Sequence, residues 1–194
     1  MSDLKIRCDW STGFQEYVDY HDKEWGVPTH DDKKHFEFLI LEGAQAGLSW
    51  ATILKRRKGY RKAFVNWDVK KVAKFDQKKI DEILQDPGVI RNKLKIHGSV
   101  TNANKFLEVQ NEFGSFDAYI WGFVGGKPIV NKCKEMSEIP ATTNESDALS
   151  KDLKKRGFKF VGSTIMYAHM QACGLVNDHA VSCFRYKEVG EMVV

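Results

Sequence analysis

The sequence predicts an all-α protein of eight or more short helices, and three observations support this fold class. Asp, Asn and Ser residues that can cap a helix precede apolar residues spaced three or four positions apart. Glycine, often with proline, follows several of these stretches and would end a helix there. No sustained alternation of apolar and polar residues, the pattern of a half-buried strand, occurs in the 194 residues.

The candidate caps divide the first part of the chain into four helical stretches. Each stretch carries apolar residues at helical spacing and ends in a basic run, a proline–glycine turn or a glycine. The four stretches run from Asp31 or Asp32 to Ala46, from Ser49 to Lys58, from Asp76 to Gln85, and from about Val89 to Phe113.

Three further helices are expected in the last 80 residues. Ser115 opens a short one, and a turn at 125–128 then leads into an irregular segment that ends near Thr143. The remaining two helices form a hairpin within about 146–174. We expect the whole chain, 1–194, to form a single unit that includes this hairpin. The predicted bounds of the two helices are Asn144 or Ser146 to Arg156, closed by Gly157, and Ser163 to Cys173.

Composition excludes several classes of protein. Hydrophobic residues make up 42% of the chain and charged residues 29%, which is typical of a globular protein and not of a disordered or collagen-like one. No apolar run approaches the ~20 residues that cross a membrane, so we expect no membrane partner. The first residues lack the core of a signal peptide, so we expect a cytoplasmic protein, in which the four cysteines need not form disulfides.

Charge is distributed unevenly along the chain. Residues 1–50 have a net charge of −5 and residues 51–194 a net charge of +9. A basic surface of this kind can bind a polyanion such as nucleic acid, but it can equally be a solvated lysine-rich face.

Two cysteines and two histidines near the chain ends form a possible metal-ligand set: Cys8, His21, His179 and Cys183. Two thiolates and two imidazoles complete a tetrahedral zinc site, which would be structural and would tie the two ends together. The spacing alone leaves open that the four are ordinary core or surface residues. Cys133 and Cys173 have no evident histidine partner in the sequence, and Cys173 is expected in the core.

Aromatic residues gather near Glu42 in the N-terminal segment. The run 38–42 places this carboxylate at the edge of an apolar helix face, and small residues at 43–47 would allow a flat ligand to approach. A carboxylate surrounded by aromatic rings can bind a cationic or amino-bearing heterocycle. The alternative is that the tryptophans are core residues and Glu42 is an exposed helix residue.

The stretch 148–164 predicts two helices joined by a tight turn between Gly157 and Gly162. Gly162 and Ser163 stand at the start of the second helix, where free N–H groups favour an anion. Lys159 adds positive charge, as do Lys154, Lys155 and Arg156, so the turn can bind a DNA phosphate without reading sequence. The alternative is an ordinary helix end followed by a helix start.

Taken together, these segments resemble the 3-methyladenine DNA glycosylase I family, a divergent branch of the helix-hairpin-helix DNA glycosylases. The likeness covers nearly the whole chain. The matching stretches are RCDW at 7–10, YVDYHDKEWGVP at 17–28, LEGAQAGLSW at 41–50, and SDALSKDLKKRGFKFVGSTIMYAHMQACGLVNDH at 146–179. Two departures from the wider superfamily are Asn177, where many members carry a catalytic Asp, and Phe160, where a glycine is usual in the turn.

The resemblance implies a role for each candidate residue. Cys8, His21, His179 and Cys183 would bind one structural zinc ion. Glu42 would contact the extruded base, as the catalytic and recognition residue, with Trp10, Tyr17, Tyr20 and Trp50 forming the pocket walls. The DNA-contacting residues would be Lys159, Gly162 and Ser163 in the hairpin, and Leu48 as a wedge into the base stack.

The implied function is hydrolysis of the N-glycosidic bond of 3-methyladenine in alkylated double-stranded DNA, which starts base excision repair. Free 3-methyladenine would be the product, and the enzyme would act as a monomer beside the bacterial chromosome. No lysine stands at the position of the amine nucleophile in bifunctional members, which argues against lyase chemistry. A zinc-stabilised DNA-binding module without catalysis is the alternative. A zinc deaminase is disfavoured because it needs H-x-E together with P-C-x-x-C, and the sequence has no P-C-x-x-C.

Overall fold

The computed structural model describes residues 5–192, and the prediction of a helical fold is confirmed. The α-helices are α1 Gln15–Lys23, α2 Asp32–Gln45, α3 Trp50–Ala63, α4 Val69–Val72, α5 Gln77–Gln85, α6 Lys93–Phe113, α7 Phe116–Trp121, α8 Asn144–Arg156, α9 Ser163–Ala172 and α10 Phe184–Glu191. Short 3₁₀-helices lie at Asp9–Ser11, Val65–Trp67, Gly122–Val124 and Met136–Glu138. The strands β1 Ile129–Val130 and β2 Val176–Asn177, which the sequence analysis did not predict, pair in parallel.

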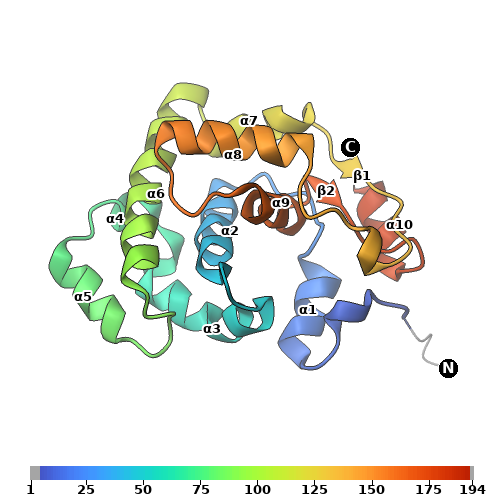
Figure 1. Ribbon diagram of the computed structural model, residues 1–194, viewed down its shortest axis with the longest axis horizontal. Coiled ribbons are helices and arrows are strands. Elements are labelled where there is room, and N and C mark those ends of the chain that lie inside the picture. The colour runs from blue at the N-terminus through green and yellow to red at the C-terminus, as the bar shows by residue number, and fades with distance from the viewer. Residues whose placement is uncertain (1–4, 193–194) are drawn as a thin grey trace.

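Helix α2 is the centre of the fold. Every residue from His35 to Ala44 is buried, including the polar residues His35, Glu37 and Glu42. It packs against α3, α6, α7 and α9, and the hairpin of α8 and α9 closes over it (Figure 1). Glu42 is therefore carried by the most deeply buried helix of the described residues.

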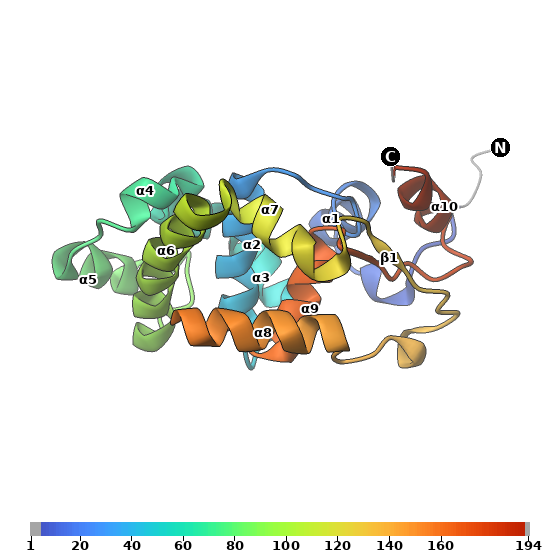
Figure 2. The same ribbon diagram turned by 90° about the horizontal axis from the view of Figure 1, so that it is seen from above.

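The molecule is elongated, with different elements at its two ends. Helices α4 and α5 lie at one end, and α1 and α10 lie at the other (Figure 2). The segment that carries Cys8 and His21 and the segment that carries His179 and Cys183 thus meet at the same end. Among the described helices, none is both long and apolar enough to cross a bilayer.

Four helices begin at the caps that the sequence predicted. The side chain of each capping residue accepts a hydrogen bond from a backbone N–H two or three positions later, which satisfies one of the free donors of the first turn. These caps are Asp31 for α2, Ser49 for α3, Asp76 for α5 and Ser115 for α7.

The predicted start of α6 at Val89 is wrong. The helix begins at Lys93 and is capped by Asn92, whose side chain accepts a hydrogen bond from the Lys95 N–H. The preceding residues form a turn instead, in which the Ile90 N–H donates to the hydroxyl of Tyr60 at 3.1 Å. A tertiary contact therefore decides where this helix starts.

The caps predicted for the hairpin are also corrected. Thr143 caps α8 and forms a reciprocal pair with Ser146, in which each side chain accepts a hydrogen bond from the other's backbone N–H. Gly162 occupies the cap position of α9. The hydroxyl of Ser163, the first residue of α9, lies 2.8 Å from that of Ser146, so it joins the two helices.

Candidate functional site

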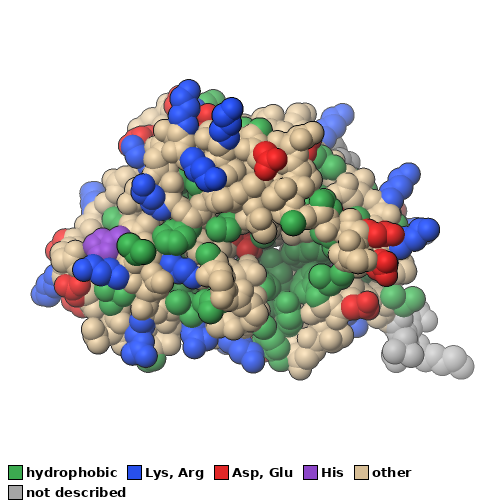
Figure 3. Space-filling model, viewed as in Figure 1, with side chains coloured by type: hydrophobic (Ala, Val, Ile, Leu, Met, Phe, Trp, Pro, Cys, Tyr) green, Lys and Arg blue, Asp and Glu red, His purple; other side chains and the backbone are tan. Residues whose placement is uncertain are grey.

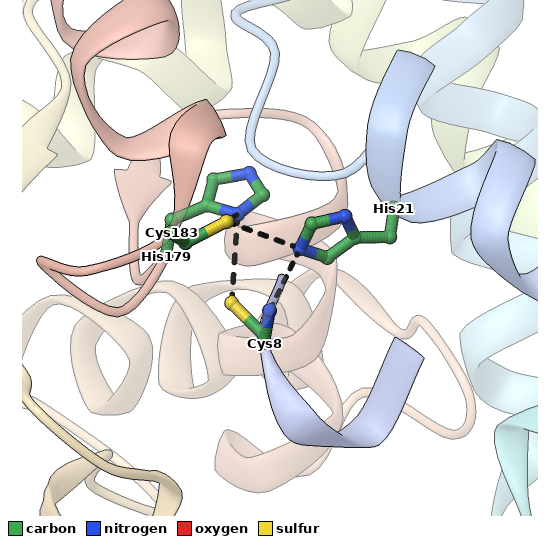
Figure 4. Close-up of side chains that lie close together, drawn as sticks. All are labelled: Cys8, His21, His179 and Cys183. Carbon is green, nitrogen blue, oxygen red and sulfur yellow. Dashed lines mark hydrogen bonds between the residues drawn. The ribbon is translucent and has the colours of Figure 1, made fainter. Parts of the chain in front are cut away.

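The four predicted metal ligands converge in the structure (Figure 4). Cys8 precedes the first 3₁₀-helix, His21 lies in α1, and His179 and Cys183 lie in the segment between β2 and α10. All four are buried, and their ligand atoms lie within 4.8 Å of one another. His179 and Cys183 do not share a helical turn, because Cys183 is the residue immediately before α10.

Interatomic distances in this group suit a tetrahedral metal. The Cys183 Sγ lies 3.5 Å from the His21 Nε2 and 3.7 Å from the His179 Nδ1, and the Cys8 Sγ lies 3.7 Å from the same His179 nitrogen. Sulfur and nitrogen ligands of tetrahedral zinc are separated by about 3.6 Å, given zinc–sulfur and zinc–nitrogen bonds of about 2.3 and 2.05 Å. The geometry therefore fits a metal ion held by two thiolates and two imidazoles.

In both histidines the second ring nitrogen, the one that does not face the cysteines, also has a hydrogen-bond partner. The His21 Nδ1 lies 2.8 Å from the carboxylate of Asp22, and Asp22 in turn accepts hydrogen bonds from Arg7. The His179 Nε2 lies 3.0 Å from the backbone oxygen of Trp25. Such partners take the outer N–H and leave the inner nitrogen as a lone-pair donor toward the metal.

The expectation that Cys173 has no histidine partner is wrong. Its Sγ lies 3.6 Å from the Nε2 of His169, four residues earlier, and the two form a second buried group with His35. This group contains three possible ligands, not four, so it does not form a closed tetrahedral set. Cys173 is fully buried, as predicted for a core residue.

A pocket of about 350 Å³ opens between α1, α2 and α9. In the space-filling view it is a hollow with mostly hydrophobic walls (Figure 3). All five residues predicted to bind the base line it: Trp10, Tyr17, Tyr20, Glu42 and Trp50. Residues that had been spread over 41 positions in the sequence thus surround one cavity large enough for a heterocyclic base.

Aromatic rings in the wall pack against each other and fix the shape of the pocket. Ring centroids are 5.2 Å apart for Trp10 and Tyr17, and 5.3 Å apart for Tyr20 and Trp50. The indole N–H of Trp50 is buried and has no hydrogen-bond partner within the described part of the chain. The residue lines the pocket and offers its ring for stacking.

Glu42 is the one carboxylate of the pocket wall, and its exposed fraction is only 4%. The alternative of an exposed helix residue is therefore excluded. Burial disfavours the charged form and raises the pKa of this carboxyl group to about 8. A carboxyl group in this state gains most from a ligand that brings a positive charge or hydrogen-bond donors.

Helix α9 supplies pocket residues that the sequence analysis missed. Thr164, Tyr167, Ala168 and Gln171 recur at helical spacing and form the wall facing Glu42, and this periodicity was the available signal. Trp25, Gln45 and four residues of the segment 136–141 complete the lining. The contribution of 136–141 left no such signal, because that segment is irregular.

Asp178 is fully engaged in hydrogen bonds. Its carboxylate accepts from Tyr167 Oη, Gln171 Nε2 and Asn131 Nδ2 at 2.6–2.7 Å, and it is 1% exposed. Asn177, at the position of the superfamily's catalytic Asp, accepts from the His179 N–H and donates to the backbone of Tyr186. Both residues therefore order the segment around His179.

The predicted DNA-contacting residues lie near the pocket mouth and in the hairpin turn. Leu48 is 40% exposed at the tip of the turn after α2, and it lines a shallow cavity with Glu42 and Thr164. Lys159 is exposed in the hairpin turn, and Gly162 is the capping residue immediately before α9. The structure thus places these residues at the surface, where a ligand can reach them.

Arg156 does not contribute free charge to the hairpin, contrary to expectation. Its guanidinium donates to the carboxylates of Glu112 and Asp152 and lies over the ring of Phe113. These contacts hold the end of α8 against α6 and α7. Lys154 and Lys155 remain exposed beside Lys159 and keep the predicted positive charge.

Comparison with known proteins gives a consistent result. Residues 10–186 match the family model of methyladenine glycosylase. DNA-3-methyladenine glycosylase 1 of Escherichia coli K12 is 50% identical over 180 residues, which cover 93% of this chain and 96% of that protein.

Solved structures agree with the sequence match. A crystal structure of 3-methyladenine DNA glycosylase I superimposes with a TM-score of 0.90 at 47% identity, covering 92% of this chain and 98% of that one. The Staphylococcus aureus enzyme, solved to explain 3-methyladenine recognition, gives a TM-score of 0.89 at 35% identity, covering 92% and 95%. With its fold and most of its length shared with these proteins, the chain belongs to the methyladenine glycosylase family.

Proposed function

We propose that this protein hydrolyses the N-glycosidic bond of 3-methyladenine in alkylated DNA and so starts base excision repair. The observation that carries the proposal is a buried carboxyl group, Glu42, in an aromatic pocket sized for one base. Family membership supports the same reaction, since the E. coli relative bears the name DNA-3-methyladenine glycosylase.

The pocket suits the chemistry of an N3-methylated adenine. Methylation makes the base cationic and therefore a good leaving group, so the protein need not supply a strong acid. The extruded base stacks on Trp50 and the tyrosines, and Glu42 accepts a hydrogen bond from the exocyclic amine. Guanine offers an acceptor at that position, and unmodified adenine lacks the charge that weakens the bond.

Bond cleavage leaves the electron pair of the glycosidic bond with the base and neutralises it. Water adds to the sugar carbon from the opposite side and loses a proton, so the products are the free base and an abasic sugar. The protein binds and orients the base. These interactions raise the rate only where they are stronger in the transition state than in the bound substrate.

DNA is held, in this proposal, by the α8–α9 hairpin and opened by Leu48. The first N–H groups of α9 and the side chain of Lys159 bind phosphates, while the exposed Leu48 fills the space left in the base stack. The protein acts on duplex DNA as a monomer.

Cys8, His21, His179 and Cys183 hold a structural zinc ion in this proposal. The distances support tetrahedral coordination, and four protein ligands leave no position for a substrate or water. When bound, the ion supplies a cross-link between the two chain ends and stabilises α1, which carries the pocket residues Tyr17 and Tyr20.

The experiment that tests the function is chromatography of bases released from methylated DNA. The glycosylase proposal expects free 3-methyladenine to accumulate with time and enzyme concentration. The alternative, a zinc-stabilised DNA-binding module, expects binding to alkylated DNA without any released base.

Monofunctional chemistry is a second expected result. No lysine among residues 5–192 lines the pocket, so no lysine amine is placed there to form a Schiff base with the sugar. Borohydride added during turnover is expected to trap no covalent enzyme–DNA adduct. A trapped adduct that survives denaturing electrophoresis would contradict this expectation.

Salt dependence tests the proposed phosphate contacts. We expect DNA affinity to fall steeply between low and moderate salt, and Lys159→Ala to weaken binding to all sequences alike and to reduce the salt slope by about one. Lys187→Ala, which removes an exposed charge from α10 at the opposite end of the molecule, is the control. An equal loss in both variants would argue against the hairpin as the contact.

A further inference from the structure

Helix α6 touches both of the elements that we propose to contact DNA. Lys95, Gly98 and Asn102 are separated by three and four positions and therefore form a stripe along one face of the helix. All three are buried, and Lys95 is 8% exposed. A buried lysine without a carboxylate partner is uncommon, so its contacts indicate what it does.

Lys95 holds the turn that carries Leu48. Its Nζ donates to the backbone oxygens of Ala44, at 2.8 Å, and Ala46, at 2.6 Å. The Leu48 N–H donates to the Gln45 oxygen, and Gly47 has a φ of +77°, which fits a type II turn. The ammonium also neutralises the negative end of α2, so it fixes where this helix stops and where Leu48 points.

Asn102 holds the hairpin turn, seven residues further along α6. Its Oδ1 accepts from the Lys159 N–H at 2.7 Å, and its Nδ2 donates to the Lys159 oxygen at 2.9 Å. These two bonds fix the backbone of Lys159 and leave its charged side chain free for solvent or DNA.

Between these two contacts lies Phe160, which has a φ of +56° that non-glycine residues rarely adopt. A Cβ atom on Gly98 would approach the Phe160 ring to 3.0 Å, and one on Gly43 would approach its Cβ to 3.3 Å. Both glycines therefore leave room for Phe160 at the junction of α2 and α6. Gly43 is the neighbour of Glu42, so the hairpin turn also packs directly beside the recognition residue.

We propose that the stripe of Lys95, Gly98 and Asn102 sets the position of Leu48 relative to the hairpin turn and to Glu42. This inference rests on the proposed function. In this arrangement Leu48 enters the base stack while the hairpin turn binds a phosphate, and the distance between Leu48 and the turn is fixed. Binding of the DNA backbone by the hairpin therefore places Leu48 at the damaged base. Displacements of about 1 Å in such an arrangement are enough to lower a rate markedly. Lys95 and Asn102 are thus positioning residues that do not touch the base.

The test is a double-mutant cycle between Lys95→Met and Leu48→Ala. Methionine keeps the unbranched stem but leaves two buried carbonyls without a donor. We expect Lys95→Met to lower excision of 3-methyladenine from duplex DNA roughly tenfold or more, and to change affinity for the free base less than about twofold. In the Leu48→Ala background it should lower excision by less than about twofold further, because the wedge it positions is already gone.

Lys78→Met removes the same charge from α5 and is the control. If the losses from Lys95→Met and Leu48→Ala multiply, or if free-base affinity falls in parallel with excision, Lys95 does not act through the wedge and the inference is overturned. If the wild type excises 3-methyladenine and the Lys95→Met variant does so equally well, the positioning role is overturned and the proposed function is not. A wild type that releases no base overturns the proposed function as well.

If Lys95→Met does not fold, Asn102→Ala carries the test. It is expected to raise the KM for methylated duplex DNA, because the hairpin backbone loses two hydrogen bonds, and to leave free-base affinity unchanged. An unchanged KM in a folded Asn102→Ala protein would overturn the inference.

Discussion

Replacing Glu42 by glutamine is expected to weaken binding of the methylated base by roughly ten- to a hundredfold. The amide keeps the shape and one acceptor but removes the charge, and a charge-assisted hydrogen bond contributes ~1.5–3 kcal/mol. Calorimetric titration with 3-methyladenine measures the loss. The excision rate should fall less, because the base loses its charge as the bond breaks and binding need not favour the transition state.

The raised pKa of Glu42 adds a pH dependence. With a pKa of about 8, the carboxyl group of the unliganded protein is protonated at neutral pH, and binding a cationic lesion to the ionised form releases a proton. Affinity for alkylated DNA should therefore rise with pH up to about 8 and then level off, apart from other titrating groups. In Glu42→Gln this rise should be absent.

Folding stability gives a separate check on the same residue. Because the pKa of Glu42 is higher in the folded than in the unfolded state, ionisation destabilises the fold as pH rises from the ordinary value of 4.5 to about 8. Glu42→Gln should unfold near the wild-type temperature at pH 4 and at a higher temperature at pH 9. A lower unfolding temperature at pH 9 would contradict the assigned burial of an unpaired carboxylate.

Glu37→Gln is the matched control for both measurements. Glu37 lies on the same helix and is equally buried, but its carboxylate accepts a hydrogen bond from Arg57 at 2.7 Å and does not line the pocket. This substitution should leave base affinity unchanged and should lower stability, since Arg57 loses a partner. Base affinity that falls in Glu37→Gln but not in Glu42→Gln would show that the pocket is assigned to the wrong carboxylate.

Replacing Cys183 by serine is expected to cause the largest loss of stability, on the order of several kcal/mol. Structural zinc contributes its binding free energy to folding, and a hydroxyl is a poor substitute for a thiolate. Elemental analysis of tag-free, chelator-washed wild type should give about one zinc per chain at this site, and Cys183→Ser should lose it. The folded fraction of the variant should keep most of its excision activity, because the metal group does not line the pocket.

Cys133→Ser is the control for that change. Cys133 is also buried. Among the described residues its Sγ donates one hydrogen bond, to the backbone oxygen of Glu138 at 3.8 Å, and it belongs to neither His/Cys group. Its replacement should leave the metal content unchanged and lower the unfolding temperature much less. Wild-type protein without bound metal, or equal losses in the two variants, would contradict a structural metal at the chain ends.

The sequence by itself determined the helical class, four helix starts and the ligand set of the metal group. Caps such as Asp31 and Ser49 act on N–H groups two or three residues away, so they can be identified without any tertiary information. The ligand types identified the possible metal group, and the matching motifs indicated the family. Both depend on residue identity and order, which the sequence states directly.

Tertiary structure decided what depends on residues far apart in the chain. The short helices α1 and α10 were not predicted, because helices of nine and eight residues are marginal alone and form here through packing. The start of α6, the ion pairs that occupy Arg156 and the contribution of 136–141 to the pocket follow from contacts across the chain. The rise in the pKa of Glu42 likewise depends on burial, which exists only once α1, α2 and α9 have packed around it.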